Sequence, residues 1–184
     1  MATGNPGKLR DLEALLAGAG VELTAFDPAV PEDADTYEGN ATIKAEAAAA
    51  TTGLPALGDD SGLEVVALEG FPGLRSARIA ASQRERERLL FARLEGVPRP
   101  WRARFVCVLA LAVPGRPTRT FSGVREGDVV EGRGEGGFGY DPVFQVPELG
   151  RTFAELASSG EKDHWSHRAA AVAALLASGA LDDL

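Results

Sequence analysis

Residues 102–124 read RARFVCVLALAVPGRPTRTFSGV, and this stretch decides the fold. Its first part contains an apolar run over 105–111, and its second part, 118–124, follows the dipeptide Pro114-Gly115. Extended segments on either side of a Pro-Gly turn are typical of paired strands. The stretch therefore predicts two long antiparallel strands, and residues 127–131 indicate a third.

The segments around this pair alternate between helical and extended patterns. Behind Pro6, leucines at positions 9, 12, 15 and 16 recur at helical spacing. Further helices are predicted at 37–50, 83–94, 152–156 and 166–181, and short strands at 21–26, 54–57 and 63–68. Because helices and strands mix throughout, the sequence predicts the α/β class, or α+β, with an elongated mixed β-sheet flanked by helices.

The bulk composition limits the function classes. The chain has 184 residues, of which 45% are hydrophobic, enough to bury a core in one domain or two small lobes. The net charge of −8 argues against nucleic acid as a partner, because few cations are present to neutralise a run of phosphates. No apolar stretch reaches membrane-spanning length, and the start is not a signal peptide. The single cysteine, Cys107, lies in the apolar run, which predicts a buried thiol and fits a reducing, cytoplasmic location.

A turn suited to phosphate stands near the N-terminus and reads Thr3-Gly4-Asn5-Pro6-Gly7-Lys8. The first N–H groups of the following helix and its positive end would face an anion, and Lys8 adds a full charge. A plain helix-capping turn has the same pattern. Met1-Ala2 leaves no room for the apolar strand expected before such a turn, so either the natural start lies upstream or the first strand is only a stub.

Two adjacent carboxylates, Asp59 and Asp60, are expected at the end of strand 54–57, before a Ser61-Gly62 turn. Neighbouring carboxylates repel each other, so this placement favours a shared cation. Glu32, in an acidic loop upstream, would add a third oxygen ligand. Mg²⁺ suits such a set because it takes few carboxylates and bridges to phosphates. A solvated turn without a metal is the alternative.

The third group is aromatic and cationic, and consists of Phe138, Gly139, Tyr140 and Asp141 with His167 and Arg168. A base could stack on one ring beside the glycine-dense loop 132–139, while Asp141 accepts a hydrogen bond. Arg168 could donate two hydrogen bonds to the O6 and N7 edge of a purine. Tyr140 as a core aromatic remains an alternative, as do Lys44 and Lys162 as surface charges.

Taken in order, these motifs resemble one known family. TGNPGK (3–8), NATIKA (40–45), GDDSGLEV (58–65), GFPGLRSAR (70–78), GGFGYDPVF (136–144) and SHRAAA (166–171) closely resemble the inosine/xanthosine triphosphate pyrophosphatases over nearly the whole chain. The resemblance implies a single domain over residues 1–184, with two lobes around a central substrate cleft and no separable linker, and a homodimer. It also implies Mg²⁺-dependent hydrolysis of ITP, dITP or XTP to the monophosphate and pyrophosphate.

The resemblance also assigns roles to individual residues. Thr3, Asn5 and Lys8, with Gly4, Pro6 and Gly7 between them, resemble the triphosphate-binding turn. Glu32 resembles a metal ligand, and Lys44, twelve positions later, a phosphate contact. Asp60 resembles the catalytic carboxylate that also meets the metal, with Asp59 beside it and Ser61 contacting the substrate. The residues that resemble the nucleoside pocket of this family are Phe138, Gly139, Tyr140, Asp141, Lys162, His167 and Arg168.

The expected mechanism is in-line attack of water on the α-phosphorus, with Asp60 or Asp59 as the base. Selectivity would come from donors to the 6-oxo group of the purine. Two other functions stay open: a related-fold pyrophosphatase for modified pyrimidine or 7-methylguanine triphosphates, and a nucleotide-binding regulatory module without turnover. The paired carboxylates favour an enzyme, because triphosphate binding alone needs cations rather than two further anions.

Overall fold

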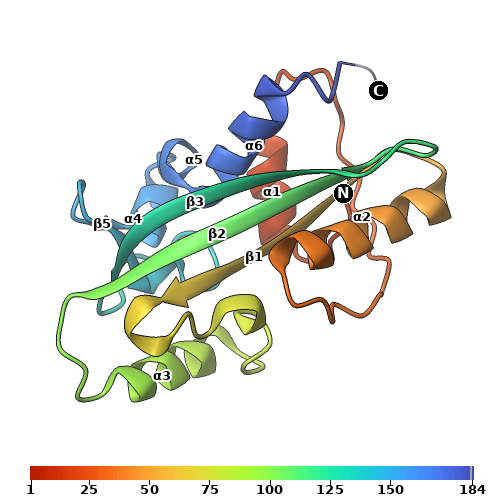
Figure 1. Cartoon of the computed structure of the whole chain (residues 1–184). Helices are drawn as coiled ribbons and strands as arrows, with labels where there is room; N and C mark the ends of the chain where they lie inside the picture. Colours follow the sequence, from red (N-terminus) through yellow and green to blue (C-terminus); the bar gives the residue numbers. More distant parts are fainter. Residues whose placement is uncertain (183) are drawn as a thin grey trace. The chain divides into compact units, whose positions relative to one another are not determined.

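The computed structural model describes residues 1–182 and Leu184, and the chain forms two compact units. Unit 1 comprises Met1–Asp60, Cys107–Gly123 and His167–Leu184; unit 2 comprises Ser61–Val106 and Val124–Ser166. The five strands of the sheet follow in the order β1-β2-β3-β4-β5 (Figure 1). Their bounds are β1 Ala56–Val65, β2 Trp101–Ala112, β3 Arg119–Val129, β4 Phe144–Val146 and β5 Arg151–Thr152.

The strand pairing is mixed. In unit 2, β4 pairs antiparallel with β3, where Val129 lies opposite Phe144, and antiparallel with β5. In unit 1, Ala2 forms parallel bridges with both Phe26 and Gly58. The predicted α/β class with a mixed sheet is thus confirmed, and the segment before the first turn contributes a single bridge residue.

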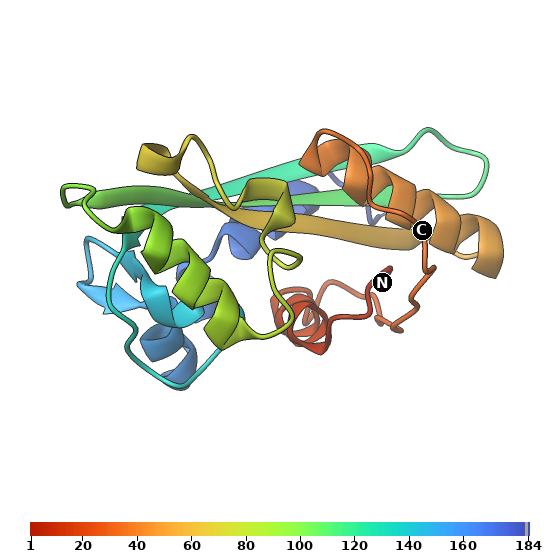
Figure 2. The same ribbon diagram turned by 90° about the horizontal axis from the view of Figure 1, so that it is seen from below.

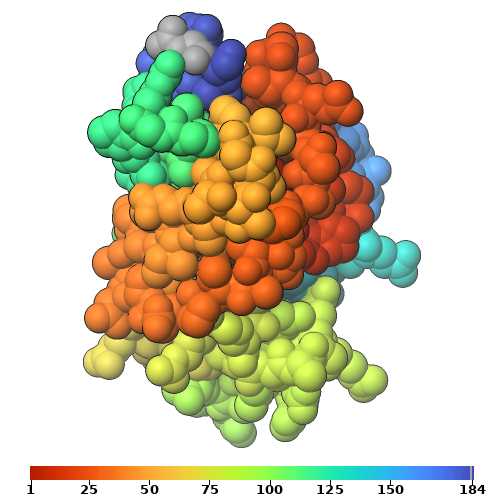
Figure 3. All heavy atoms as spheres, turned by 90° about the vertical axis from the view of Figure 1, so that its right-hand side faces the viewer, coloured from red at the N-terminus to blue at the C-terminus, as the bar shows by residue number. Residues whose placement is uncertain are grey.

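In unit 1, three helices pack on the strands: α1 (Pro6–Leu15), α2 (Tyr37–Thr52) and α6 (His167–Ala177). The core includes Leu12, Leu57, Leu109, Phe121 and Leu175. The buried face of α2 includes alanines at positions 41, 45, 48 and 49, whose small side chains let the helix lie close along β1 (Figure 2). At the surface, Thr118 Oγ1 donates a 2.6 Å hydrogen bond to Glu46 Oε1, beside the hairpin turn that is green in Figure 3.

In unit 2, the helices are α3 (Gln83–Leu94), α4 (Phe153–Ser158) and α5 (Lys162–Trp165), with three 3₁₀ turns η1 (Val66–Leu68), η2 (Gly73–Arg75) and η3 (Asp141–Val143). An aromatic cluster forms the centre of the core. The rings of Phe105 and Phe153 stack with centroids 5.7 Å apart, and Phe144 lies 4.8 Å from each. This geometry suits the quadrupoles of aromatic rings.

Several predicted boundaries are confirmed. Helix α3 has the predicted bounds, and α1 begins at Pro6 as expected. Thr152 is the N-cap of α4 and forms a capping box with Glu155, which places that helix start as predicted. Within the described residues, no helix has both the length and the hydrophobicity needed to cross a bilayer.

Other predictions are wrong. Residues 59–62 form no turn, because β1 continues through them to Val65. Segments 118–124 and 127–131 belong largely to one strand, β3, which runs over Arg119–Val129. Gly127 lies inside this strand, where the ring of Phe144 occupies the space that a side chain would need. Residues 21–26 make only the bridge at Phe26, and the closing helix begins at His167 and ends at Ala177.

A methyl group at Gly58 should destabilise the protein. A Cβ there would collide with the carbonyl oxygen of Ala41 in α2. We expect Gly58→Ala to lower the free energy of unfolding by about 1–3 kcal/mol through overpacking, measured by urea denaturation. Gly132→Ala is the control, because its Cβ would meet Val143 at 3.7 Å and Pro142 at 3.9 Å, both ordinary contact distances. Equal stability of the two variants would contradict this account.

Candidate active site

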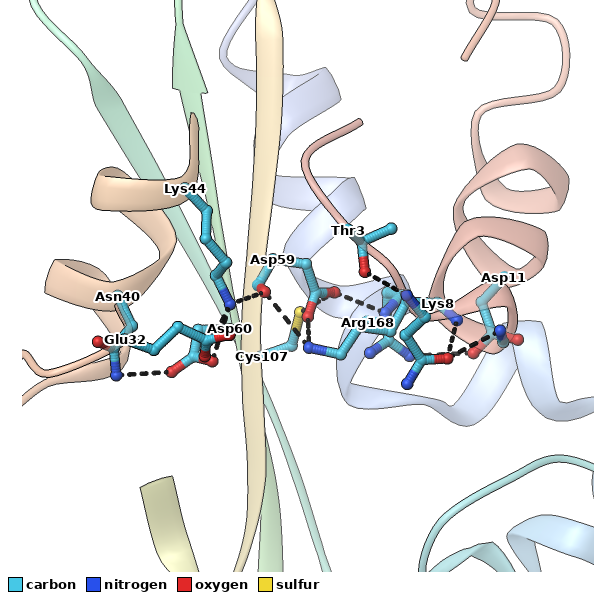
Figure 4. Close-up of polar contacts among 12 residues, drawn as sticks. Thr3, Lys8, Asp11, Glu32, Asn40, Lys44, Asp59, Asp60, Cys107 and Arg168 are labelled. Atoms are coloured by element: carbon cyan, nitrogen blue, oxygen red, sulfur yellow. Dashed lines mark hydrogen bonds and ion pairs between the residues drawn. The ribbon is translucent and has the colours of Figure 1, made fainter. Parts of the chain in front are cut away.

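Asp59 and Asp60 lie within one continuous strand, so their side chains point to opposite faces of β1. Figure 4 shows Asp59 directed toward Lys8 and Arg168, and Asp60 directed toward Lys44 and Asn40. The two carboxylates therefore do not share a cation. The turn on which the prediction of one shared metal ion rested is absent, because β1 runs through both residues; binding of a metal by Asp59 stays a prediction.

The carboxylate of Asp59 is fully buried and paired with two cations. Its Oδ1 lies 2.5 Å from Lys8 Nζ, and its Oδ2 accepts a 2.8 Å hydrogen bond from Arg168 Nε. The thiol of Cys107 donates a longer bond, 3.5 Å, to Oδ2. Burial alone would raise the pKa of Asp59, but attraction by Arg168 and Lys8 outweighs it and holds the pKa well below its usual range. Asp59 is therefore a fixed anion.

Asp60 has a different environment. Its Oδ1 accepts a 3.1 Å hydrogen bond from Lys44 Nζ, and its Oδ2 accepts a 3.3 Å bond from Asn40 Nδ2. Lys44 also lies 3.2 Å from Glu32 Oε2. Burial raises the pKa of Asp60, and Lys44 and Lys8 offset this only in part. The two neighbouring aspartates thus have pKa values displaced in opposite directions.

Lys8 and Lys44 also meet at the backbone of β1. The carbonyl oxygen of Asp59 accepts a 2.7 Å bond from Lys44 Nζ and a 3.3 Å bond from Lys8 Nζ. The side chain of Lys44 is only 9% exposed and that of Lys8 only 15%. Both ammonium groups are thereby fixed, and Lys44 is not the free surface charge that was the alternative.

The N-terminal turn caps α1. Asn5 is the N-cap, and its Oδ1 accepts hydrogen bonds from the N–H groups of Gly7 at 2.8 Å and Lys8 at 3.3 Å. The N–H of Asn5 itself donates to Thr3 Oγ1 at 3.0 Å. This local network fixes where α1 begins, and so fixes the position from which Lys8 reaches Asp59.

Unit 2 contains a second buried ion pair. Lys162 Nζ and the N–H of Phe138 both donate to Asp141 Oδ2 at 2.8 Å. The ammonium of Lys162 lies 4.7 Å from the centroid of the Phe138 ring, within cation–π distance. The carboxylate therefore holds one cation against one face of a partly exposed ring.

Tyr140 is a core residue. It is 4% exposed, and its hydroxyl donates a 3.1 Å hydrogen bond to the carbonyl of Ser76. Burial raises the pKa of Tyr140 to about 12. Ser76 Oγ in turn accepts from the N–H of Leu63 in β1 at 2.9 Å. Tyr140 thus fastens the glycine-dense loop to the segment after β1.

The sequence and structure of the chain match those of known proteins. The model of the Ham1 family matches residues 1–178. The chain belongs to the Ham1 family. A dITP/XTP pyrophosphatase of Symbiobacterium thermophilum is 50% identical over 96% of this chain and 91% of its own length, and one of Thermus thermophilus is 48% identical over 96% and 88%. The structure of a HAM1 protein from Coxiella burnetii superimposes with a TM-score of 0.83 at 38% identity, covering 100% of this chain and 97% of that one.

Membership of the Ham1 family confirms the resemblance seen in the motifs, but the structure gives some motif residues other surroundings. Arg168, expected to contact the purine, is 1% exposed; its Nε binds Asp59 and its NH1 binds Asp11 at 2.9 Å. His167, at the start of α6, is 4% exposed. Ser61 is partly buried in the middle of β1. Contact of these residues with a substrate stays a prediction.

Three residues in these networks were missed by sequence reasoning. Asn40 binds Asp60, Asp11 binds Arg168, and Ser76 binds Tyr140. A signal existed for two of them. Asn40 lies four positions before Lys44, and Asp11 three positions after Lys8, so each shares a helix face with a predicted lysine. For Ser76 nothing in the sequence indicated a contact with a residue 64 positions away.

The donor set fits Mg²⁺ only in part. Glu32 and Asp60 offer carboxylate oxygens around the same ammonium group, that of Lys44, and a site for Mg²⁺ needs only one or two carboxylates besides phosphates. Asp59 does not belong to this set, because both of its oxygens are paired within the protein. Across the described residues, no group of three or more His, Cys, Asp or Glu side chains is arranged to hold a metal.

Removal of the charge on Asp59 should destabilise the fold strongly. Asp59→Asn leaves the buried Arg168 with one carboxylate partner, and breaking such a pair costs about 3–5 kcal/mol. We expect that loss in urea unfolding at neutral pH. Because the folded pKa of Asp59 is depressed, its contribution is complete above the unfolded value of about 4 and is lost as the pH falls through the folded pKa. The stability difference between wild type and variant should therefore shrink in acid.

Glu64→Gln is the control for this measurement. It removes a carboxylate from the more exposed pair with Arg104, whose side chain is 50% exposed. Such pairs contribute about 0–1 kcal/mol. A loss in Asp59→Asn no larger than in Glu64→Gln would contradict the role of Asp59 as a buried anchor.

Proposed function

We propose that this protein is a nucleoside-triphosphate pyrophosphatase that hydrolyses deaminated purine triphosphates, namely ITP, dITP and XTP, to the monophosphate and pyrophosphate. The names of its Ham1 relatives support this activity. The observation that carries it is the different surroundings of two neighbouring carboxylates: Asp59 is held between Lys8 and Arg168, whereas Asp60 lies with Glu32 around Lys44. Their pKa values are displaced in opposite directions, that of Asp59 downward and that of Asp60 upward. Paired titratable groups separated in this way are typical of acid–base sites.

Asp60 is the base in this proposal, because Asp59 is permanently engaged by Lys8 and Arg168. Asp60 accepts a proton from water as the water oxygen attacks the α-phosphorus. The bond between the α-phosphorus and the bridging oxygen breaks, and pyrophosphate leaves. Lys8 and Lys44 offset the negative charge that the phosphates carry through this step.

The charge of the unit 1 network supports a divalent cation. Its contacts join the carboxylates of Asp11, Glu32, Asp59 and Asp60 to the cations of Lys8, Lys44 and Arg168. Four carboxylates against three cations leave −1, which would repel a triphosphate; one divalent cation changes this to +1. Glu32 and Asp60 would hold Mg²⁺, which when bound neutralises phosphate charge and polarises the phosphoryl group.

Base selection is assigned to unit 2. The ring of Phe138 offers a stacking face, and the ammonium of Lys162, fixed by Asp141, offers a donor beside it. A 6-oxo group can accept a hydrogen bond from one N–H of this ammonium, whereas the 6-amino group of adenine would place two donors against each other. Sites of this kind reject the mismatched analogue strongly. The burial of Arg168 supports a positioning role at Asp59 instead of contact with the base.

Three further expectations stay predictions: a homodimer, a cytoplasmic location, and a single domain without a separable linker.

Product analysis tests the reaction. With Mg²⁺, we expect pyrophosphate from ITP, dITP and XTP and little from GTP or dUTP, and no pyrophosphate after chelation of the metal. In ¹⁸O-labelled water the label should enter the monophosphate, because water attacks the α-phosphorus. Label in pyrophosphate would contradict this mechanism. A preference for dUTP would favour a pyrimidine enzyme, and binding without turnover would favour a regulatory module.

Asp60→Asn tests the base. The variant keeps the shape of the side chain but cannot accept the proton, so kcat for dITP should fall by about 10²–10⁴-fold while the variant stays folded. Asp35→Asn makes the same change on an exposed residue of the acidic loop and should leave kcat unchanged. If Asp60→Asn kept most of the wild-type rate, the assignment would be wrong.

A further inference from the structure

Asn40 uses its whole carboxamide inside unit 1. The residue is 0% exposed. Its Oδ1 accepts a 3.0 Å hydrogen bond from the N–H of Ala34, and its Nδ2 donates to the carbonyl of Ala34 at 3.4 Å. The same Nδ2 donates to Asp60 Oδ2 at 3.3 Å (Figure 4). One side chain therefore connects the acidic loop before α2 to the middle of β1.

Asn40 and Lys44 act from one face of α2. They are four residues apart, which places both side chains over the same strip of the helix surface. Lys44 binds Asp60 Oδ1 and Glu32 Oε2, whereas Asn40 binds Asp60 Oδ2 and the backbone two residues after Glu32. Asn40 thus orients both carboxylates: Asp60 through a direct hydrogen bond, and Glu32 through the backbone of the loop that carries it.

The neutral donor has a different electrostatic effect from the cation. Lys44 offsets the charge of Asp60 and so competes with a metal ion for it. A carboxamide N–H orients the same carboxylate and leaves its full negative charge for another cation. Holding the loop alone would require only the two bonds to Ala34, so the bond to Asp60 is an additional function of this side chain.

We propose that Asn40 is a positioning residue for the divalent cation: it orients Asp60 and fixes the loop that carries Glu32, so that both carboxylates are arranged for the metal before nucleotide binds. This inference rests on the proposed function, in which Asp60 and Glu32 hold the cation. Partners of this kind orient metal ligands, and their loss weakens metal binding about 10–100-fold.

Mn²⁺ binding without nucleotide tests the proposal. Mn²⁺ takes the same oxygen ligands as Mg²⁺, and electron paramagnetic resonance counts the free ion directly. We expect Asn40→Ala to raise the Kd for Mn²⁺ about 10–100-fold relative to wild type. In steady-state assays the Mg²⁺ concentration for half-maximal rate should rise with it, while the KM for dITP changes far less.

Thr36→Ala is the matched control. Thr36 is the N-cap of α2 and accepts a 3.0 Å hydrogen bond from the N–H of Gly39, so its loss disturbs the same end of the helix. This hydrogen bond of Thr36 lies at the start of α2 itself. Loss of such a cap costs about 1 kcal/mol of stability, and the Kd for Mn²⁺ should stay within about twofold of wild type. Urea unfolding of both variants shows that the comparison is made on folded protein.

If Asn40→Ala does not fold, Asn40→Ser replaces it, since its short hydroxyl cannot reach Ala34 and Asp60 together and the same weakening is expected. A folded Asn40 variant that binds Mn²⁺ as tightly as Thr36→Ala overturns the inference and leaves the proposed function intact. A wild type that neither binds Mn²⁺ nor hydrolyses dITP overturns both.

Discussion

The buried pairing of Asp59 with Lys8 and Arg168 is the interaction on which the rest of unit 1 depends. It joins three segments far apart in the chain: the start of α1, the middle of β1 and the start of α6. Charges so deeply buried are tolerated only when every one is paired and hydrogen-bonded. The pairing therefore constrains the positions of these three elements, and the apolar core around Leu12, Leu109 and Leu175 packs within that constraint.

From this anchor the chemistry of the neighbouring residue follows. Two cations neutralise Asp59 on one face of β1, whereas the carboxylate of Asp60 on the other face pairs with a single lysine, Lys44. Two residues of α2 donate hydrogen bonds to the carboxylate of Asp60: Lys44 from a charged ammonium and Asn40 from a neutral amide. The close approach of α2 to β1, made possible by Gly58 and the alanines of the helix, brings both donors within reach.

Much of the fold was predictable from local pattern, because caps and apolar periodicity act over a few residues. Helix α3 and the start of α1 are examples. The motif 59–62 misled because Asp, Ser and Gly are poor strand formers; contacts with residues as distant as Arg168 override that preference. Distance along the chain also explains why the contacts of Arg168 and Asn40 were not predicted. Arg168 was assigned to the substrate and Asn40 to no role, because their partners Asp59 and Asp60 come close only in the folded chain.

The alternation of side chains along β1 has a consequence for folding. The strand presents two carboxylates in succession, so a slip of one residue in its pairing would turn each of them to the opposite face of β1. The proton-accepting group would then face Arg168 and Lys8, and the anchoring group would face α2. Such a slip would place an aspartate at only one of the two native positions, and Gly58 or Ser61 would stand at the other. Because Arg168 contacts only the Asp59 face and Asn40 only the Asp60 face, the network stabilises only the native register of the strand.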